Sequence, residues 1–169
     1  VEDVIFLSLT NKTTDLPKNV ISSGVNSLSQ VNAIKKFLKL NDVNKTIFLT
    51  PDLDYKTEIT KAIKQSKIKI SKKYIYDTKP TNLTKQIEDI TNYKIRKQNL
   101  ADEILRVKKS DLEDKEKQLE KLEKRYTIGN VKFDSVIIAD FEESLKSVIT
   151  SLLYTCLLYT SPSPRDGSE

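Results

Sequence analysis

The sequence contains no histidine, no methionine and no tryptophan, and it has one cysteine and three glycines among 169 residues. Without histidine, the chain lacks the base of the serine and cysteine triads and the ligands of HExxH metal sites. One cysteine excludes an internal disulfide framework and a cysteine-rich zinc site. No apolar run approaches the about 18 residues that a membrane-spanning helix needs. The glycine-rich motifs of dinucleotide-binding proteins, P-loop proteins and α/β hydrolases are also absent.

Arginine is scarce too, since only four of the 29 basic residues are arginine. With 24 acidic residues the formal net charge is +5. Lysine is spread along the whole chain and is interleaved with acidic residues. A nucleic-acid-binding protein usually gathers its basic side chains on one face, next to aromatic stacking partners. We therefore expect no nucleic-acid partner.

Short apolar runs alternate with stretches of helical periodicity. The apolar runs predict strands at 4–9, 46–50, 68–76 and 135–139, while 20–24 is ambiguous. Helices are expected at 27–41, around 59–63, from Pro80 to 90, and over 145–153. Ser27 and Gln30 have the spacing of a capping box at the start of the first helix. Strands that alternate with helices form parallel sheets through right-handed crossovers. The predicted fold class is α/β, with a parallel sheet and flanking helices.

Residues 93–126 interrupt this alternation with a long charged segment that lacks proline and glycine. Acidic residues precede basic residues by four positions at Asp102/Arg106, Asp111/Lys115, Glu113/Lys117 and Glu120/Lys124, which favours a solvated helix. Leucines recur every seven residues, but the second apolar seam of a coiled coil is missing. Ser110 and Glu113 also form a capping-box pattern. We predict a hairpin of two helices, 94–109 and 111–125, with a single bent helix as the alternative.

Open parallel sheets bind ligands at the carboxyl ends of their strands. The residues expected at that edge are Thr10, Asn11, Pro51, Asp52, Asp54, Tyr55, Asp77 and Asp140. Asp52 and Asp54 allow three interpretations together with Tyr55. The two carboxylates could hold Mg²⁺, as in a receiver-like phosphoacceptor domain. One of them could cap the next helix, or Tyr55 could reach a small ligand.

The order of these pieces resembles the leucine-binding-like family of type I periplasmic binding proteins. The segments that carry the likeness are VIFLSLTN, QVNAIKKFLKLN, KTIFLTPDLDY, IKISKKYIYDTKPTNLTKQI and FDSVIIAD. Lys56 stands where that family usually has a glycine. The resemblance implies that residues 1–24 end a first lobe and that 25–155 form most of a second lobe. It also implies a protein that is not an enzyme and holds no catalytic residue, metal or cofactor.

The charged segment 93–126 adds a second, more specific resemblance. From NYKIRKQNLADEI to RYTIGNVKFDSVIIADFEESLKSVITSLLY, the chain resembles penicillin-binding-protein activators. The matching positions are Tyr93, Arg96, Thr127, Gly129, Phe133, Asp134, Ser135 and Val136. The resemblance implies a periplasmic regulator that contacts a peptidoglycan synthase, and that meets a membrane only through a lipid anchor outside this sequence. On this interpretation the charged segment is a docking arm, and a solvated insertion without function is the alternative.

Two sets of candidate site residues follow from the resemblance. Tyr55, Asp140 and Phe141 would line a ligand cleft, because the family uses the corresponding tyrosine and the residues after the FDxV strand. Arg96, Arg106, Glu113 and Glu120 would contact a protein partner from the charged segment. A solute receptor for an amino-acid-type transporter stays open as a second function, with Ser22 and Ser23 as further cleft residues. A receiver-like domain is a distant third.

The two ends of the sequence carry expectations of their own. Residues 156–166 read CLLYTSPSPRD, which resembles the translation of a transposase-type sequencing adapter. We therefore expect 156–169 to be an artefactual tail and exclude it from fold reasoning. The missing initiator methionine predicts that the sequence starts inside a longer reading frame.

Overall fold

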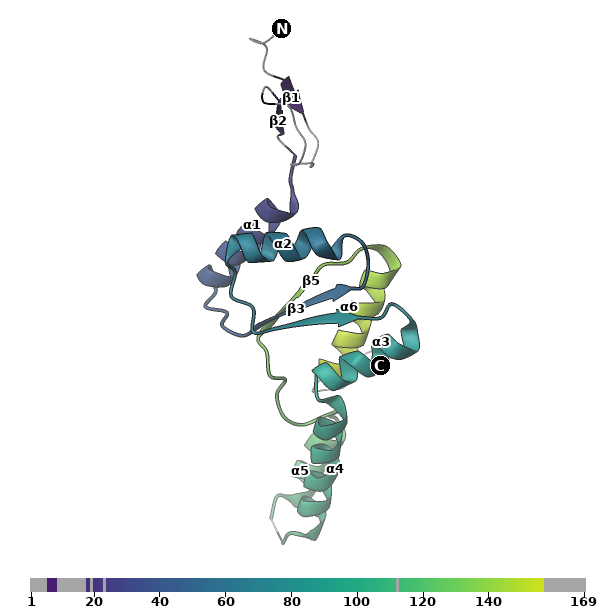
Figure 1. Cartoon of the computed structure of the whole chain (residues 1–169). Coiled ribbons are helices and arrows are strands. Elements are labelled where there is room, and N and C mark those ends of the chain that lie inside the picture. Colours follow the sequence, from purple (N-terminus) through teal and green to yellow (C-terminus); the bar gives the residue numbers. More distant parts are fainter. Residues whose placement is uncertain (1–5, 9–17, 19, 23, 112, 157–169) are drawn as a thin grey trace, which may run out of the picture. The chain divides into compact units, whose positions relative to one another are not determined.

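The computed structural model describes residues 6–8, 18, 20–22, 24–111 and 113–156 (Figure 1). The chain divides into two compact units. The first unit contains Val1–Ile75 and Asp134–Ala139, and the second unit contains Tyr76–Phe133 and Asp140–Glu169. Thr10, Asn11 and Ser23, which were candidate site residues, lie outside the described residues, as does most of the predicted tail.

A parallel sheet of three strands forms the centre of the first unit. Its strands are β3 (Thr46–Pro51), β4 (Lys72–Tyr76) and β5 (Ser135–Ile138), in the order β4-β3-β5. β3 and β5 are parallel, with Thr46 opposite Ser135 and Leu49 opposite Ile138. The α/β prediction is confirmed. Two boundaries differ from prediction, because β3 includes Pro51 and β4 begins only at Lys72.

Two helices cover β3 in the first unit. α1 (Ser27–Leu40) and α2 (Lys56–Ser66) contribute Val31, Leu38, Ala62 and Ile63 to one apolar cluster, which also contains Phe48 of β3. This packing explains the helical periodicity of both segments, since each helix buries one stripe.

The start of α1 is one residue away from its predicted position. Asn26 caps the helix by accepting the Ser29 N–H at 2.9 Å, and Ser29 completes the capping box. The predicted Ser27/Gln30 box is therefore wrong, because Asn26 satisfies the same backbone donors. The predicted end is confirmed, since Asn41 is the C-cap residue.

A separate two-stranded sheet lies N-terminal to α1 in the sequence. β1 (Phe6–Ser8) and β2 (Val20–Ser22) pair in parallel, with Phe6 opposite Val20. β1 confirms the central part of the strand predicted at 4–9. The ambiguous segment 20–24 contributes β2.

The second unit is helical. It contains α3 (Pro80–Ile90), α4 (Tyr93–Lys109), α5 (Lys115–Glu123) and α6 (Glu142–Cys156). α3 packs against α6, and α4 packs against α5. Pro80 occupies the first helical position of α3, where its fixed φ and missing N–H cost nothing. Within the described residues, no helix has the length and apolar character that a membrane crossing requires.

The predicted helical hairpin is confirmed as α4 and α5, and we call residues 93–126 the arm. Leu100, Val107 and Leu122 form its buried core, against which Ile104, Leu119 and Ile128 pack. α5 begins at Lys115 and not at 111. The predicted Ser110/Glu113 capping box does not form, because Ser110 Oγ donates to Val107 O at 2.7 Å and closes the end of α4 instead.

Candidate functional site

The end of β4 and the residues after β5 form a small polar group in the second unit. The hydroxyl of buried Tyr76 donates to the Asp140 carboxylate, and the Phe141 N–H donates to Asp140 Oδ1 at 2.9 Å. Asp140 is half-buried, whereas the Phe141 ring is exposed. The two predicted cleft residues Asp140 and Phe141 therefore lie together. Each oxygen of the Asp140 carboxylate already accepts a donor from the chain itself.

Asp77, the first residue after β4, organises the start of α3. Its carboxylate accepts the Lys79 N–H at 2.9 Å and the Asn82 side-chain amide at 2.6 Å. The hydrogen bond from the Lys79 backbone, followed by that from Asn82, lowers the pKa of Asp77. The Asp77 N–H in turn donates to Gln86 Oε1 at 2.9 Å. This network stabilises the turn between β4 and α3, so the Asp77 carboxylate has a structural role in that turn.

The residues between β3 and α2 belong to the first unit. Asp52 forms an ion pair with Lys56, and half-buried Tyr55 occupies the N-cap position of α2 without a side-chain capping bond. The interpretation of Asp52 or Asp54 as the helix cap is therefore wrong, because Tyr55 holds that position. Within the described part of the chain there is no group of three or more acidic, histidine or cysteine residues that could hold a metal ion.

Arg96 lies in the interior at the base of the arm. It is 3% exposed. Its Nε donates to Gly129 O at 3.0 Å, Nη1 to Thr155 O at 2.7 Å and Nη2 to Thr127 Oγ1 at 2.9 Å. The guanidinium fork thus joins the first turn of α4, the segment after α5 and the end of α6. This placement corrects the prediction that Arg96 contacts a partner, because its donors are directed inward.

The backbone reinforces the same junction. The Ile128 N–H donates to Arg96 O at 3.1 Å, so the chain leaves the arm next to the point where it enters. Gly129 has a φ of 97°, a left-handed conformation that L side chains rarely adopt. The base of the arm is therefore closed by both side-chain and backbone hydrogen bonds.

Three tyrosines pack beside this base. The Tyr93 hydroxyl donates to the Tyr154 hydroxyl at 3.1 Å, and the two ring centroids are 5.4 Å apart. Tyr126 adds a second ring contact to Tyr154, with centroids 6.4 Å apart. Burial raises the pKa of Tyr93 to about 12, and the hydrogen bond with Tyr154 adds to the shift.

The Tyr93 pKa predicts a loss of stability in alkali. Its stabilising contribution is complete well below pH 10, the ordinary pKa, because Tyr93 is then neutral in both states. As the pH rises from 10 toward 12, the unfolded state ionises first and the free energy of unfolding falls. Urea unfolding across this range should show a steeper decline for the wild type than for Tyr93→Phe. Equal slopes would contradict the shifted pKa.

The other predicted partner residues lie on the surface of the arm. Arg106 pairs with Glu103 at 2.5 Å, not with Asp102 as its spacing predicted, and this hydrogen bond lowers the pKa of Glu103. Glu120 pairs with Lys124 at 2.6 Å, as predicted. Arg106, Glu113 and Glu120 are all exposed. They are spread over both helices of the arm and the turn between them.

Sequence reasoning missed Tyr76, Thr127 and Thr155 as members of these networks. Tyr76 ends a predicted strand next to Asp77, so its position at the carboxyl edge was a usable signal. Thr127 was among the positions of the family resemblance, but nothing connected it with Arg96, which is 31 residues away. Thr155 carried no signal, because Arg96 is 59 residues away.

Comparison with known proteins identifies no matching family model, no matching curated protein and no matching solved structure.

Proposed function

We propose that this protein is a non-enzymatic regulator with a type I periplasmic-binding-like fold, and that it acts by binding a peptidoglycan synthase in the periplasm. The choice of partner and compartment rests on the sequence resemblance to penicillin-binding-protein activators. The structural observation that supports contact with a protein is the arm, a helical hairpin with its own core and a closed base.

The arm has the features of a preformed contact surface. α5 has nine residues, fewer than the about 12–15 that an isolated helix needs in water, so it depends on packing against α4. Val107 and Leu122 supply that packing from inside the hairpin. The arm therefore holds its shape through its own side chains. Binding a partner with such an element costs little ordering entropy.

The outer surface of the arm combines apolar and charged side chains. Leu105 and Ile95 are large and exposed, and Arg106 lies next to Leu105 in the sequence. The buried centre of a protein interface is rich in apolar surface, arginine is enriched there, and polar side chains form the rim. These residues are the ones we expect to meet the synthase.

Removal of residues 97–124 tests this proposal. Because Ile128 N–H already donates to Arg96 O, the remaining residues 125–127 can close the gap as a short loop. We expect the full chain to retain a purified peptidoglycan synthase in a pull-down and the deletion variant to lose this binding. Equal binding by both proteins would contradict the role of the arm. Failure of the full chain to bind any synthase would contradict the proposed function.

A solute receptor is the second candidate, and half-buried Asp140 is the observation that favours it. A receptor for a zwitterion needs a carboxylate for the amine and donors for the other end of the ligand. The donors from Tyr76 and Phe141 to Asp140 weigh against this role, since an amine would compete with them. A rise in unfolding temperature with one free amino acid would favour the receptor.

A further inference from the structure

The two units differ sharply in charge. The first unit contains 13 basic and 8 acidic residues, whereas the second contains 16 of each. The whole net charge of +5 therefore belongs to the first unit. All four arginines are in the second unit, so the excess charge of the first unit is carried by lysine alone.

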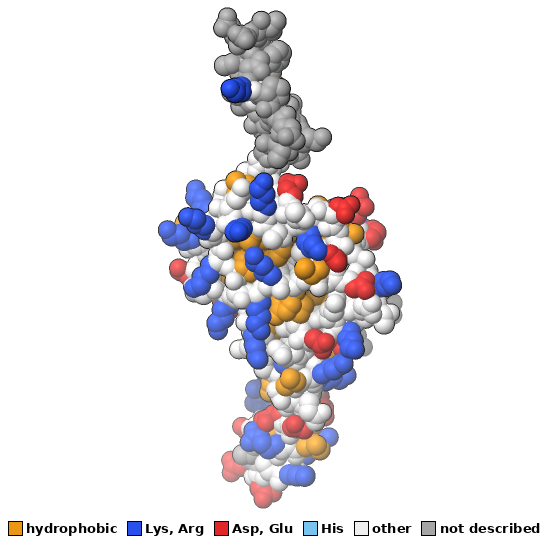
Figure 2. Space-filling view, viewed as in Figure 1, with side chains coloured by type: hydrophobic (Ala, Val, Ile, Leu, Met, Phe, Trp, Pro, Cys, Tyr) orange, Lys and Arg blue, Asp and Glu red, His pale blue; other side chains and the backbone are white. Residues whose placement is uncertain are grey.

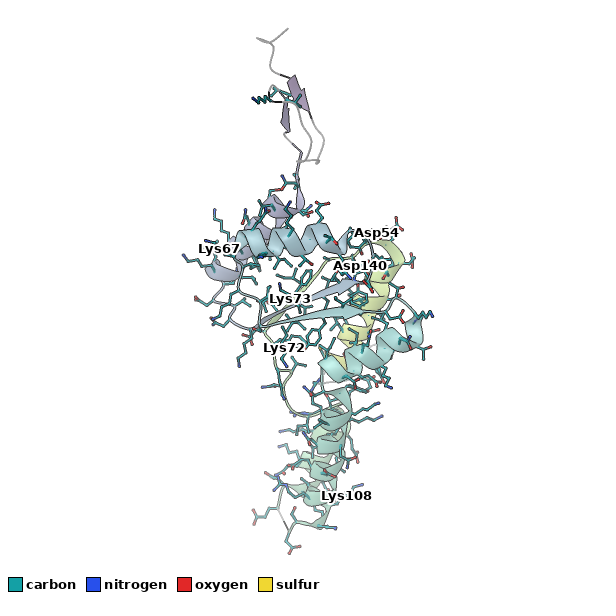
Figure 3. The ribbon with its side chains drawn as sticks, in the orientation of Figure 1. Asp54, Lys67, Lys72, Lys73, Lys108 and Asp140 are labelled. Atoms are coloured by element: carbon teal, nitrogen blue, oxygen red, sulfur yellow. The ribbon has the colours of Figure 1, made fainter. Side chains whose placement is uncertain are left out.

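Nine of the thirteen lysines of the first unit lie where α1 and α2 end and where β3 and β4 begin. Helices that connect parallel strands run antiparallel to them. The C-terminal ends of the helices therefore lie beside the N-terminal ends of the strands. We call this region the basic end. Figure 3 shows Lys67, Lys72 and Lys73 there, and in Figure 2 blue side chains gather around it. Its exposed lysines are Lys35, Lys36, Lys39, Lys45, Lys64, Lys67, Lys69, Lys72 and Lys73.

Little negative charge balances the basic end. Asp42 and Asp134 are the acidic residues in the same segments, and Asp134 already accepts the Lys45 N–H at 3.1 Å. Lys35 donates to Ser66 O at 2.8 Å and so closes the last turn of α2. Within the described residues, the other eight lysine amines form no ion pair. The basic end therefore carries charge that a polyanion can neutralise.

Two large apolar side chains are exposed among these lysines. Phe37 is 62% exposed and Leu40 is 72% exposed, and they lie three residues apart on α1. Lys36 and Lys39 precede them directly in the sequence. Residues three apart share one side of a helix, so the aromatic and aliphatic groups form one exposed surface with lysines beside it. Apolar side chains next to a lysine-rich face are typical of segments that lie in a membrane interface.

We propose that the basic end docks on a bilayer with anionic headgroups, and that Phe37 and Leu40 enter the headgroup region. Lysines would neutralise the lipid phosphates, and the two apolar side chains would leave water. A nucleic-acid duplex fits this surface less well, because its outer surface is lined by phosphates, which would engage the lysines but leave the exposed side chains of Phe37 and Leu40 in water. The folded unit itself makes this contact, independently of any lipid anchor or of the arm.

The absence of tryptophan makes a direct test available. In the Phe37→Trp variant of the full chain, all tryptophan fluorescence comes from position 37. We expect phosphatidylglycerol-containing vesicles to shift its emission to the blue and to sediment the protein, and high salt to weaken both effects. Vesicles of phosphatidylcholine alone should do neither. Binding without a blue shift, or binding to duplex DNA and not to vesicles, would overturn the proposal.

Charge variants of the same protein test which lysines act. Changing Lys67, Lys72 and Lys73 to glutamine should weaken vesicle binding about a hundredfold, because each lysine near an anionic surface contributes about fivefold. The matched control changes three exposed lysines of the second unit, Lys85, Lys108 and Lys132, to glutamine. Both triple variants have the same net charge. If both lose the same affinity, the basic end is not the docking surface.

Discussion

Replacing Arg96 with leucine is expected to lower the free energy of unfolding by about 3 kcal/mol. The substitution removes the donors to Gly129 O, Thr155 O and Thr127 Oγ1. Each acceptor that is left buried without a donor costs about 1–3 kcal/mol. Leucine fills part of the space but bonds to none of the three. Lysine should restore only part of the loss, because an ammonium group cannot reproduce the planar fork of the guanidinium.

Urea unfolding measures this effect. Arg106→Leu is the matched control, because Arg106 is exposed and bonds to Glu103 on the surface of the same helix. The control should unfold at the same urea concentration as the wild type, since exposed ion pairs contribute little. An equal loss in both variants would show that Arg96 stabilises α4 as any arginine would, and does not join three segments.

A charge in the core of the arm is the second large change. Val107→Asp places a carboxylate at a position that is 1% exposed, against Leu100 and Leu122. An uncompensated buried charge is among the most destabilising single changes. The small core of the arm contains too few apolar side chains to offset that cost. We expect α5 to unfold, because nine residues do not form a stable helix alone. Binding to the synthase should be lost as completely as in the deletion variant.

Circular dichroism and limited trypsin digestion report the outcome. The lysines of α5 should become cleavable, and helical signal should decrease. Leu105→Asp is the matched control, since Leu105 lies two residues earlier on the same helix and is 55% exposed. It should leave α5 folded and reduce synthase binding, because Leu105 is one of the residues expected to meet the synthase. Intact α5 in Val107→Asp would contradict the role of this core.

The spacing of apolar residues along the chain predicted much of the fold, because a strand buries one face of side chains and a helix buries one stripe. The three strands of the parallel sheet and the α/β class followed from periodicity, whereas the two-helix arm followed from the spacing of its charges and the missing second apolar seam. Boundaries were less predictable. β4 starts four residues later than its apolar run, since buried Ile68 belongs to the cluster beneath α1 and α2 and not to the strand. Asn26, one residue before the predicted Ser27, is the N-cap residue of α1, and its side chain accepts a backbone N–H as the predicted cap would have done.

The candidate site was predictable only where its residues are neighbours along the chain. Asp140 and Phe141 are adjacent, and their placement at a strand end followed from the βα order. Tyr76 was not identified although it ends a predicted strand, because its hydrogen bond is to Asp140, which is 64 residues away. Arg96 was assigned to the surface because it lies in a highly charged segment, and nothing local distinguishes a buried arginine from an exposed one.

The sequence alone therefore determined the class of fold, the arm and the absence from these residues of histidine-dependent triads, HExxH metal sites and cysteine-rich zinc sites, because these depend on residue type and short-range spacing. The tertiary structure decided which charged side chains are buried, which form ion pairs and which lie together on one surface. Lysine is dispersed along the chain, yet the crossover geometry brings nine of these residues to one end of the first unit. Arg96 becomes internal for the same reason, since three distant segments supply its acceptors only once the chain has folded.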